Sequence, residues 1–241
     1  DDLQIGRGET ISDTAKIISG FCSALIVRTF AQSDVDELGK YATIPVINAL
    51  TDDDHPTQLL ADWLTIRENF GKDLKKRKFV YVGDGNNVAN AWLIMGATMG
   101  AHIVVATPAG KWAPKVSVVD QANKIAKKSG ARIEITTDPK AAAKDASVIY
   151  TDVWMSMGDS EADRSEKISA LSPFAVTNEL MSLTTKDSIF MHCLPAHRGE
   201  EVAADVIDGP KSVVWRQAFH RRTTIQALLY HLTRGDLKGN E

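Results

Sequence analysis

Apolar runs alternate with amphipathic stretches along almost the whole chain. This pattern is typical of βαβ units and predicts a mainly parallel sheet flanked by helices. Helices are expected at 10–19, 33–42 and 56–70, with Ser33 as the N-cap of the second, and strands at 24–30 and 45–49. The third helix ends at Gly71 and is long enough to connect two domains.

A second α/β unit follows the basic run 75–78, which we interpret as a solvated turn. Its strands are expected at 79–82, 103–107, 132–136, 148–151, 189–191 and 213–215, and an amphipathic segment at 221–233 is expected to fold back over the first unit. The predicted fold is therefore α/β with two lobes, each a mainly parallel sheet flanked by helices, and with the first lobe incomplete. We place the first lobe at 1–70, the second at 71–215 and a returning C-terminal helix at 216–241.

Composition narrows the functional classes. The 28 Lys and Arg against 31 Asp and Glu leave a net charge of −3 and no basic stripe, so nucleic acid is not an expected partner. No apolar run reaches the 18 or so residues of a membrane span, so no membrane partner is expected. Cys22 and Cys193 fit no metal-ligand spacing, and so few cysteines favour a reducing compartment, with both as free thiols and the protein in the cytoplasm.

Three polar motifs each follow a predicted strand. They are His55-Pro56-Thr57-Gln58, the segment 152–158 (Asp-Val-Trp-Met-Ser-Met-Gly) and His192-Cys193-Leu194-Pro195. Ligands of open parallel sheets bind beyond the carboxyl ends of the strands, so the three motifs predict one site. His55 and Gln58 lie one turn apart at an expected helix start, where the helix dipole favours a phosphate or carboxylate.

Two segments of the chain also allow other interpretations. The turn 83–88 (Gly-Asp-Gly-Asn-Asn-Val) is only a poor match to a dinucleotide fingerprint, because Val88 stands where the third glycine or alanine belongs. Its two asparagines either bind a zwitterionic small molecule or cap the following helix. A Cys193 and His192 nucleophile is conceivable, but no third member or oxyanion hole is evident, and a buried inert cysteine is an equally simple interpretation.

The chain resembles the ornithine carbamoyltransferases over nearly its whole length. The resemblance is carried by the three motifs together with residues 4–10, the strand end at 28–30 and the Asn-rich turn. The resemblance implies transfer of a carbamoyl group from carbamoyl phosphate to the δ-amino group of L-ornithine, giving L-citrulline and phosphate, with no metal or organic cofactor. The residues that it assigns to carbamoyl phosphate are Gln4, Arg28, His55, Gln58 and Arg221. Those that it assigns to ornithine are Asn87, Asp152, Ser156, Met157, Cys193 and Leu194.

The resemblance also implies roles for several of these residues. Arg28 and His55 would polarise the carbamoyl carbonyl, Asp152 would bind the α-ammonium and Asn87 the carboxylate. The thiol or thiolate of Cys193 would help to orient and deprotonate the amine, and the loop 156–158 would close over the amino acid. Arg28, His55, Asp152 and Cys193 are therefore the expected catalytic residues.

Two departures from the family pattern stand out. The Ser-Thr-Arg-Thr phosphate loop of the family is absent, and the chain begins at Asp1, so we expect an incomplete chain; the alternative is a fragment that binds ornithine without catalysis. Phe219 and His220 replace the family's Glu-Asn before Arg221, which puts the orientation of Arg221 in question. The family resemblance further implies a homotrimer or higher homo-oligomer, with Gln4 reaching a neighbouring site, while an amine acceptor other than ornithine is disfavoured by Asp152 and the Ser-Met-Gly loop.

Overall fold

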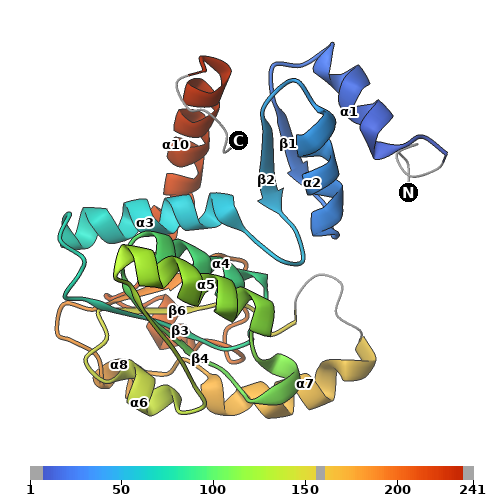
Figure 1. Ribbon diagram of the computed structural model, residues 1–241. Helices are drawn as coiled ribbons and strands as arrows, with labels where there is room; N and C mark the ends of the chain where they lie inside the picture. The colour runs from blue at the N-terminus through green and yellow to red at the C-terminus, as the bar shows by residue number, and fades with distance from the viewer. Residues whose placement is uncertain (1–7, 156–160, 236–241) are drawn as a thin grey trace.

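The computed structural model describes residues 8–155 and 161–235, and it contains two parallel sheets joined by a long helix (Figure 1). The first sheet has two strands, β1 (Leu25–Arg28) and β2 (Val46–Leu50), which pair in parallel. Helices α1 (Ile11–Ser19) and α2 (Gln32–Tyr41) belong to the same lobe. Helix α3 (Pro56–Phe70) then leads from this lobe to the second sheet, as Figure 1 shows.

The second sheet has five parallel strands in the order β5-β4-β3-β6-β7. Their bounds are β3 Lys78–Val82, β4 His102–Ala106, β5 Arg132–Thr136, β6 Val148–Thr151 and β7 Ile189–His192. The α-helices between and after them are α4 Asn87–Thr98, α5 Val116–Ser129, α6 Pro139–Ala143, α7 Arg164–Leu171, α8 Asn178–Ser182, α9 Ala204–Ile207 and α10 Val214–Thr233, and short 3₁₀ turns lie at Gly110–Trp112, Glu161–Asp163 and Ser172–Phe174. From β3 the chain first adds β4 and β5 on one side of the sheet and then adds β6 and β7 on the other side of β3. The strand order therefore reverses between β3 and β6.

The predicted α/β class with mainly parallel sheets is confirmed, and most elements begin and end within two residues of the predicted bounds. Three details were wrong, and one of them is the start of the last helix, α10, which lies at Val214 and not at the predicted residue 221. Ser33 is not the N-cap of α2, because Ala31 occupies that position and caps with no side-chain hydrogen bond. The predicted strand at 213–215 is the start of α10, in which Val214 is fully buried while Trp215 is 67% exposed. A Val-Val-Trp run is apolar enough for a strand, but packing of Val214 against the sheet determines the structure here.

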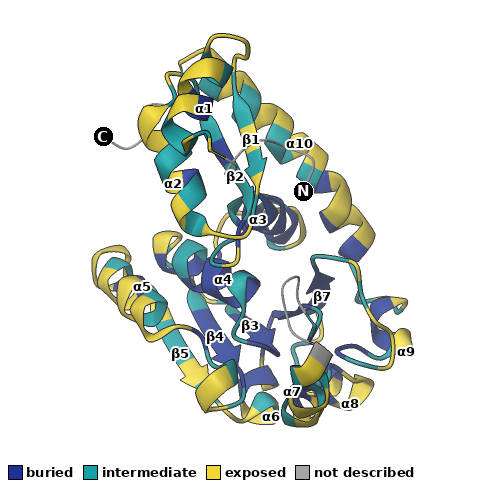
Figure 2. Ribbon diagram, turned by 90° about the vertical axis from the view of Figure 1, so that its right-hand side faces the viewer, coloured by how far each residue is buried: buried dark blue, intermediate teal, exposed yellow. Residues whose placement is uncertain are grey.

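Aromatic side chains fill the face of the larger sheet that α3, α4 and α5 cover, and Figure 2 shows this interior as mostly buried. The Trp63 ring of α3 meets Phe79 of β3 edge-on, with ring centroids 5.5 Å apart. Trp92 of α4 lies 4.8 Å from Tyr150 of β6. Such aromatic pairs stabilise beyond their buried area, so they hold α3 and α4 firmly against the sheet that carries the second and third motifs.

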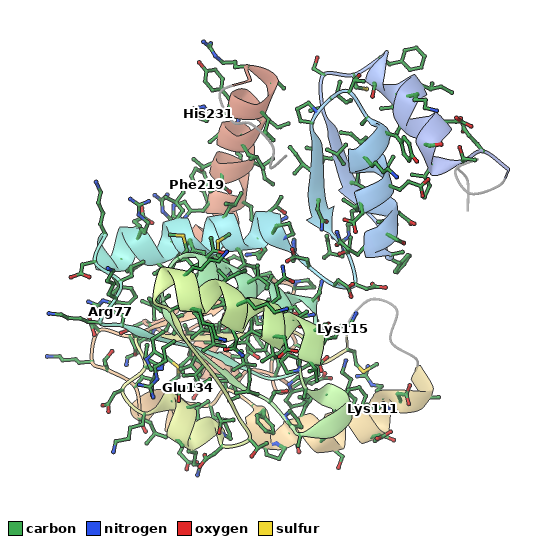
Figure 3. The ribbon with its side chains drawn as sticks, viewed as in Figure 1. Arg77, Lys111, Lys115, Glu134, Phe219 and His231 are labelled. Atoms are coloured by element: carbon green, nitrogen blue, oxygen red, sulfur yellow. The ribbon has the colours of Figure 1, made fainter. Side chains whose placement is uncertain are left out.

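The basic run at 75–78 lies far from the first lobe, and Figure 3 shows Arg77 at the opposite end of the second lobe from Lys111 and Lys115. The Arg77 guanidinium stacks on the Phe70 ring, 4.0 Å from its centroid, and pairs with Asp187 at 3.0 Å. Lys75 and Lys76 are exposed, as a solvated turn requires. In the described ranges 8–155 and 161–235, no helix is both long and apolar enough to cross a membrane.

A matched pair of helical glycines tests the packing of α4 on β4. A Cβ atom on Gly96 of α4 would lie 2.1 Å from Cγ1 of Ile103, whereas a Cβ on Gly39 of α2 would meet nothing within 4 Å. Gly96→Ala should therefore destabilise the protein by about 1–3 kcal/mol through overpacking. Gly39→Ala should instead stabilise it by up to about 1 kcal/mol through helix propensity. Denaturant unfolding of both variants would measure this, and equal effects would contradict the packing described here.

Candidate active site

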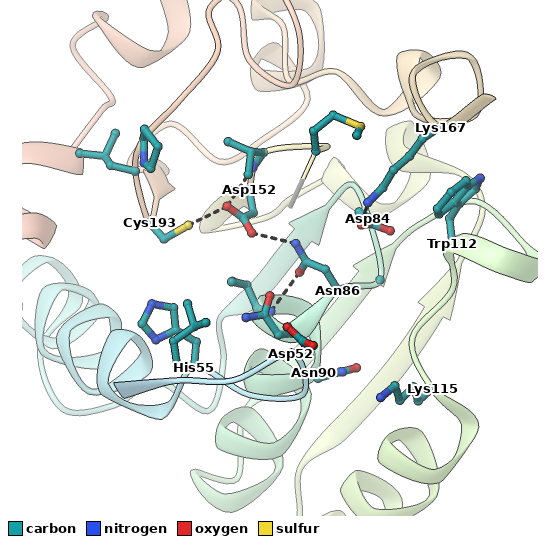
Figure 4. A pocket seen from close by; sticks show the side chains of 18 of the residues that line it. Asp52, His55, Asp84, Asn86, Asn90, Trp112, Lys115, Asp152, Lys167 and Cys193 are labelled. Carbon is teal, nitrogen blue, oxygen red and sulfur yellow. Dashed lines mark hydrogen bonds and ion pairs between the residues drawn. The ribbon is translucent and has the colours of Figure 1, made fainter. Parts of the chain in front are cut away.

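A cavity of about 680 Å³ opens at the carboxyl ends of β3, β6 and β7, on the side facing the first lobe (Figure 4). Seven of the residues predicted for the site line it: Arg28, His55, Asn87, Asp152, Cys193, Leu194 and Arg221. Gln58 is 1% exposed and lies behind the wall, in contact with Arg221. Gln4, Ser156 and Met157 lie outside the described residues. The structure thus brings together all three motifs, which are separated by up to about 140 residues in the sequence.

The turn after β3 and the end of β6 meet where the strand order reverses, which is the usual ligand position in such sheets. Asn86 is the N-cap of α4, because its Oδ1 accepts hydrogen bonds from the backbone N–H groups of Val88 and Ala89. Its amide nitrogen donates to Oδ2 of Asp152 at 2.8 Å. The capping interpretation of the Asn-rich turn is therefore confirmed for Asn86, and the same side chain also fixes Asp152.

Gly85 is needed in this turn for a steric reason. A Cβ atom there would lie 2.3 Å from the backbone nitrogen of Pro114 and 2.4 Å from the carbonyl carbon of Ala113. The backbone N–H of Gly85 donates to the carbonyl oxygen of Trp112 at 2.8 Å. The glycine of this turn thus serves close packing of the segment 112–114 against the end of β3.

The Cys193 side chain contacts Asp152 at the cavity wall. Its thiol donates a hydrogen bond to Oδ1 of Asp152 at 2.8 Å, as the dashed line in Figure 4 shows. Burial, followed by the charge of the Asp152 carboxylate, raises the pKa of Cys193 well above its ordinary value. The side chain is therefore a thiol, and of the two forms suggested by the sequence only the protonated donor fits this geometry.

The neighbouring His192 does not activate Cys193. The backbone N–H of Leu194 donates to Nδ1 of His192 at 2.9 Å, so Nε2 carries the proton and donates to Oε1 of Glu201 at 3.2 Å. His192 and Glu201 both have fully buried side chains. With both ring nitrogens occupied, this histidine shapes the loop that follows β7, and the conceivable Cys-His nucleophile is not formed.

His55 lies between two arginines at the start of α3. It is the residue before Pro56, the first residue of that helix, and it is 7% exposed. Burial, together with the positive charges of Arg221 and Arg28, lowers the pKa of His55 to about 3. The imidazole is consequently neutral near neutral pH, so it can polarise a ligand as a neutral donor while the arginines carry the positive charge.

Arg221 is oriented by α3. Its Nη1 donates to Oε1 of Gln58 at 2.6 Å. One residue earlier, Nδ1 of His220 lies 2.8 Å from the hydroxyl of Thr65, and Arg216 forms a two-point ion pair with Glu68. Although Phe219 and His220 replace the family's Glu-Asn, α10 is still held against α3 by the contacts of Arg216, His220 and Arg221.

Several cavity residues were not indicated by the sequence patterns. Asp84 and Lys167 form a buried ion pair at 2.7 Å, visible in Figure 4, that ties α7 to the end of β3. Lys115 pairs with Asp53 of the first lobe, near Lys111 and Trp112 on the cavity wall. The two residues of each ion pair lie far apart in the sequence, so no sequence pattern connects them. The one sequence feature that points to the cavity is the position of Asp84 directly after a predicted strand.

The end of β2 is also tied to α4. Nδ2 of Asn87 donates to the carbonyl oxygen of Thr51 at 2.9 Å, and Nδ2 of Asn90 donates to that of Asp53 at 3.3 Å. Each amide nitrogen has a second hydrogen. Asn87 can therefore hold the two lobes together and still donate to a ligand carboxylate.

Two groups of side chains in the described part of the chain have metal-ligand chemistry. They are Asp152, His192 and Cys193, and His197, Glu200 and Glu201, each with ligand atoms within 4.8 Å of one another. In the first group the histidine nitrogens and the thiol already have protein partners. A metal ion there would have to displace those contacts.

The neutral state of His55 gives a pH prediction. Its pKa is about 3 in the folded protein and 6.5 in the absence of a shift, so only the unfolded chain takes up this proton as the pH falls from 6.5. The stability contributed by this group should be full above about pH 6.5 and decline toward pH 3. The NMR signal of the His55 ring can be identified because it is absent from the spectrum of His55→Asn. Its chemical shift should stay constant down to about pH 4. A titration midpoint near pH 6.5 for this signal would refute the neutral state of His55.

Comparisons with known proteins match both parts of the chain. The carbamoyl-P binding domain of aspartate/ornithine carbamoyltransferases matches residues 1–68, and the Asp/Orn binding domain of the same proteins matches residues 75–232. An ornithine carbamoyltransferase from Anoxybacillus flavithermus is 52% identical over 231 residues, which cover 96% of this chain and 73% of that protein.

Solved structures show the same relationship. Ornithine carbamoyltransferase from Pyrococcus furiosus superposes with a TM-score of 0.91 at 51% identity, over 98% of this chain and 74% of that chain. The enzyme from Gloeobacter violaceus gives a TM-score of 0.85 at 42% identity, over 93% and 75%. The predicted resemblance is confirmed, and the chain belongs to the aspartate/ornithine carbamoyltransferase family, among its ornithine carbamoyltransferases.

Proposed function

We propose that this protein transfers the carbamoyl group of carbamoyl phosphate to the δ-amino group of L-ornithine, giving L-citrulline and phosphate. The observation that carries the proposal is a single cavity with two chemically different sides. Arg28 and Arg221 lie near enough to His55 to lower its pKa, which makes one group, and Asp152 and Cys193 are joined by a hydrogen bond, which makes the other. A dianion and an amino acid are the pair of substrates that such a cavity would take, in agreement with the names of the relatives.

On the phosphate side, Arg28 and Arg221 would bind the phosphate oxygens, with the start of α3 adding the positive end of its dipole. Neutral His55 and Gln58 would hold the carbamoyl group. As the amine attacks, negative charge grows on the carbonyl oxygen. Donors already in place around that oxygen would stabilise this charge more than they stabilise the ground state.

On the amino-acid side, the Asp152 carboxylate would bind the α-ammonium group and Asn87 the α-carboxylate, while Ser156 and Met157 would contact the substrate from the loop after β6. The Cys193 thiol and Leu194 would lie beside the reacting amine. Asn86 and Cys193 already hydrogen-bond the Asp152 carboxylate, which fixes its position before ornithine arrives. Preorganised positioning of this kind contributes several kcal/mol to catalysis in other enzymes, about 7–11 at most.

The chemical step needs an uncharged amine. An alkylammonium titrates near 10, as in lysine, so the site must favour its neutral form. The nitrogen lone pair forms the new N–C bond, and the C–O bond to phosphate breaks. The amine proton passes to the departing phosphate, which is a base near neutral pH. We propose no metal or organic cofactor for this step.

We extend the proposal to the domain roles. Residues 1–70 would supply the carbamoyl-phosphate half, 71–215 the ornithine half, and 216–241 would return Arg221 to the first half. A cytoplasmic location stays a prediction from cysteine usage. Both cysteines are free in the structure, as expected.

The direct test is citrulline formation from carbamoyl phosphate and ornithine by the purified protein, with putrescine and aspartate as competing acceptors. We expect citrulline, and a loss of at least about 10-fold in rate with either other amine. Putrescine has no α-carboxylate for Asn87, and aspartate bound by Asp152 through its α-ammonium group has no second amine to react. Asp152→Asn should raise the KM for ornithine by roughly 10-fold or more while changing the KM for carbamoyl phosphate little. The exposed Asp120→Asn in α5 is the control and should change neither. Ornithine binding without citrulline would support a non-catalytic protein and refute the proposal.

We also propose a homotrimer or a higher homo-oligomer in which Gln4 reaches a neighbouring site. Light scattering should then give a mass of three times the 26.3 kDa chain, or a multiple of that value. Gln4→Ala should lower activity without changing the mass. A monomer with full activity would contradict both parts of this proposal.

A further inference from the structure

Asp62 is a buried carboxylate behind the cavity. It lies on α3 between the two lobes and is 0% exposed. Its Oδ1 accepts hydrogen bonds from two amide nitrogens, Nε2 of Gln58 at 2.8 Å and Nε2 of Gln217 at 2.6 Å. Burying a carboxylate costs stability, and an apolar residue of similar size is often at least as stable at such a position. The cost suggests that Asp62 has a use beyond packing.

The side-chain oxygens of the two amides, Gln58 and Gln217, accept hydrogen bonds from different parts of the site. Oε1 of Gln58 accepts from Nη1 of Arg221 at 2.6 Å, on the phosphate side of the cavity. Oε1 of Gln217 accepts from the backbone N–H of His192 at 3.0 Å, directly before Cys193. One carboxylate oxygen therefore connects, through two hydrogen bonds on each side, the two groups that hold the opposite ends of the site.

The chemistry of the three groups makes this arrangement directional. Oδ1 of Asp62 accepts both hydrogen bonds, which it can do whether or not Oδ2 carries a proton, so both amides turn their nitrogens toward Asp62 and their oxygens away. Those oxygens are what Arg221 and the His192 N–H require, because both are donors. Without an acceptor at position 62 either amide can flip and present its NH₂ group to another donor. Burial raises the pKa of Asp62 to about 7, and the hydrogen bonds from Gln58 and Gln217 act against this shift.

We propose that Asp62 is a positioning residue that couples the two substrate subsites, so that an anion on Arg221 favours the arrangement of the loop after β7 that receives the amino acid. The inference rests on the proposed function for the identity of the ligands. Binding of one ligand should accordingly raise the affinity for the other, and by linkage the factor is the same in both directions. The coupling does not require Asp62 to touch either substrate.

The test is calorimetric binding of L-norvaline, which is ornithine without its δ-amino group and so cannot be carbamoylated. Its affinity is measured with and without carbamoyl phosphate, and the ratio is the coupling factor. In the wild-type protein we expect a factor of at least about 5. Asp62→Leu removes the acceptor and should bring the factor to about 1. Asp62→Asn keeps one acceptor oxygen for both amides and should restore much of it.

Thr65→Val is the matched control. Thr65 is also buried, lies one turn further along α3 and contacts α10 through His220, but it does not bind Asp62, Gln58 or Gln217. It should leave the coupling factor unchanged. Gln217→Met should abolish the factor as Asp62→Leu does, with no further loss in the double variant. It also tests the proposal if Asp62→Leu proves unfolded in a thermal melt.

Three results would overturn the inference: no coupling in the wild type, full coupling in folded Asp62→Leu or Gln217→Met, or an equal loss in Thr65→Val. Failure of the proposed function gives a different result. In that case the wild type forms no citrulline, whereas the coupling between the two bound ligands is measured independently of turnover.

Discussion

The carboxyl ends of parallel strands must meet at one edge of a sheet, and every feature of the site depends on this constraint. β3, β6 and β7 end side by side, so the turn after β3, Asp152 and Cys193 converge although they are distant in the sequence. Antiparallel strands would place successive loops at opposite edges. The reversal of strand order between β3 and β6 then leaves room for a ligand between their ends.

Helix α3 supplies the second half of the site because it is buried on nearly all sides. Its apolar residues Leu59, Trp63 and Ile66 pack on the larger sheet, and the polar residues Gln58, Asp62 and Thr65 between them are buried as well. Each buried polar group needs a partner. Gln58, Asp62 and Thr65 find theirs on α10, so that one helix pair both joins the lobes and orients Arg221.

The fold was largely predictable because hydrophobic periodicity reports which side of an element is buried. α3 and the strands β5 and β6 matched their predicted bounds. The site residues at strand ends were predictable for the same reason, and the family motifs named them. Periodicity does not predict which polar residues pair with each other. Asp84 and Lys167 are 83 positions apart in the sequence, and Asp62 and Gln217 are 155 positions apart. A charged residue in a helix is ordinarily interpreted as solvent-facing, and only the packed structure shows that Asp62 is enclosed.

Burial also determines where charge lies in the cavity. It neutralises His55 and keeps the Cys193 thiol protonated, in each case because the charged form is poorly solvated. Full charge then remains with the arginines on one side and with Asp152 on the other. On the proposed function, a substrate pair with a dianion at one end and an ammonium at the other would be held along this axis, with its uncharged reacting atoms beside the two neutral side chains. The same low dielectric that suppresses ionisation of His55 and Cys193 strengthens every hydrogen bond to the charge that develops between them.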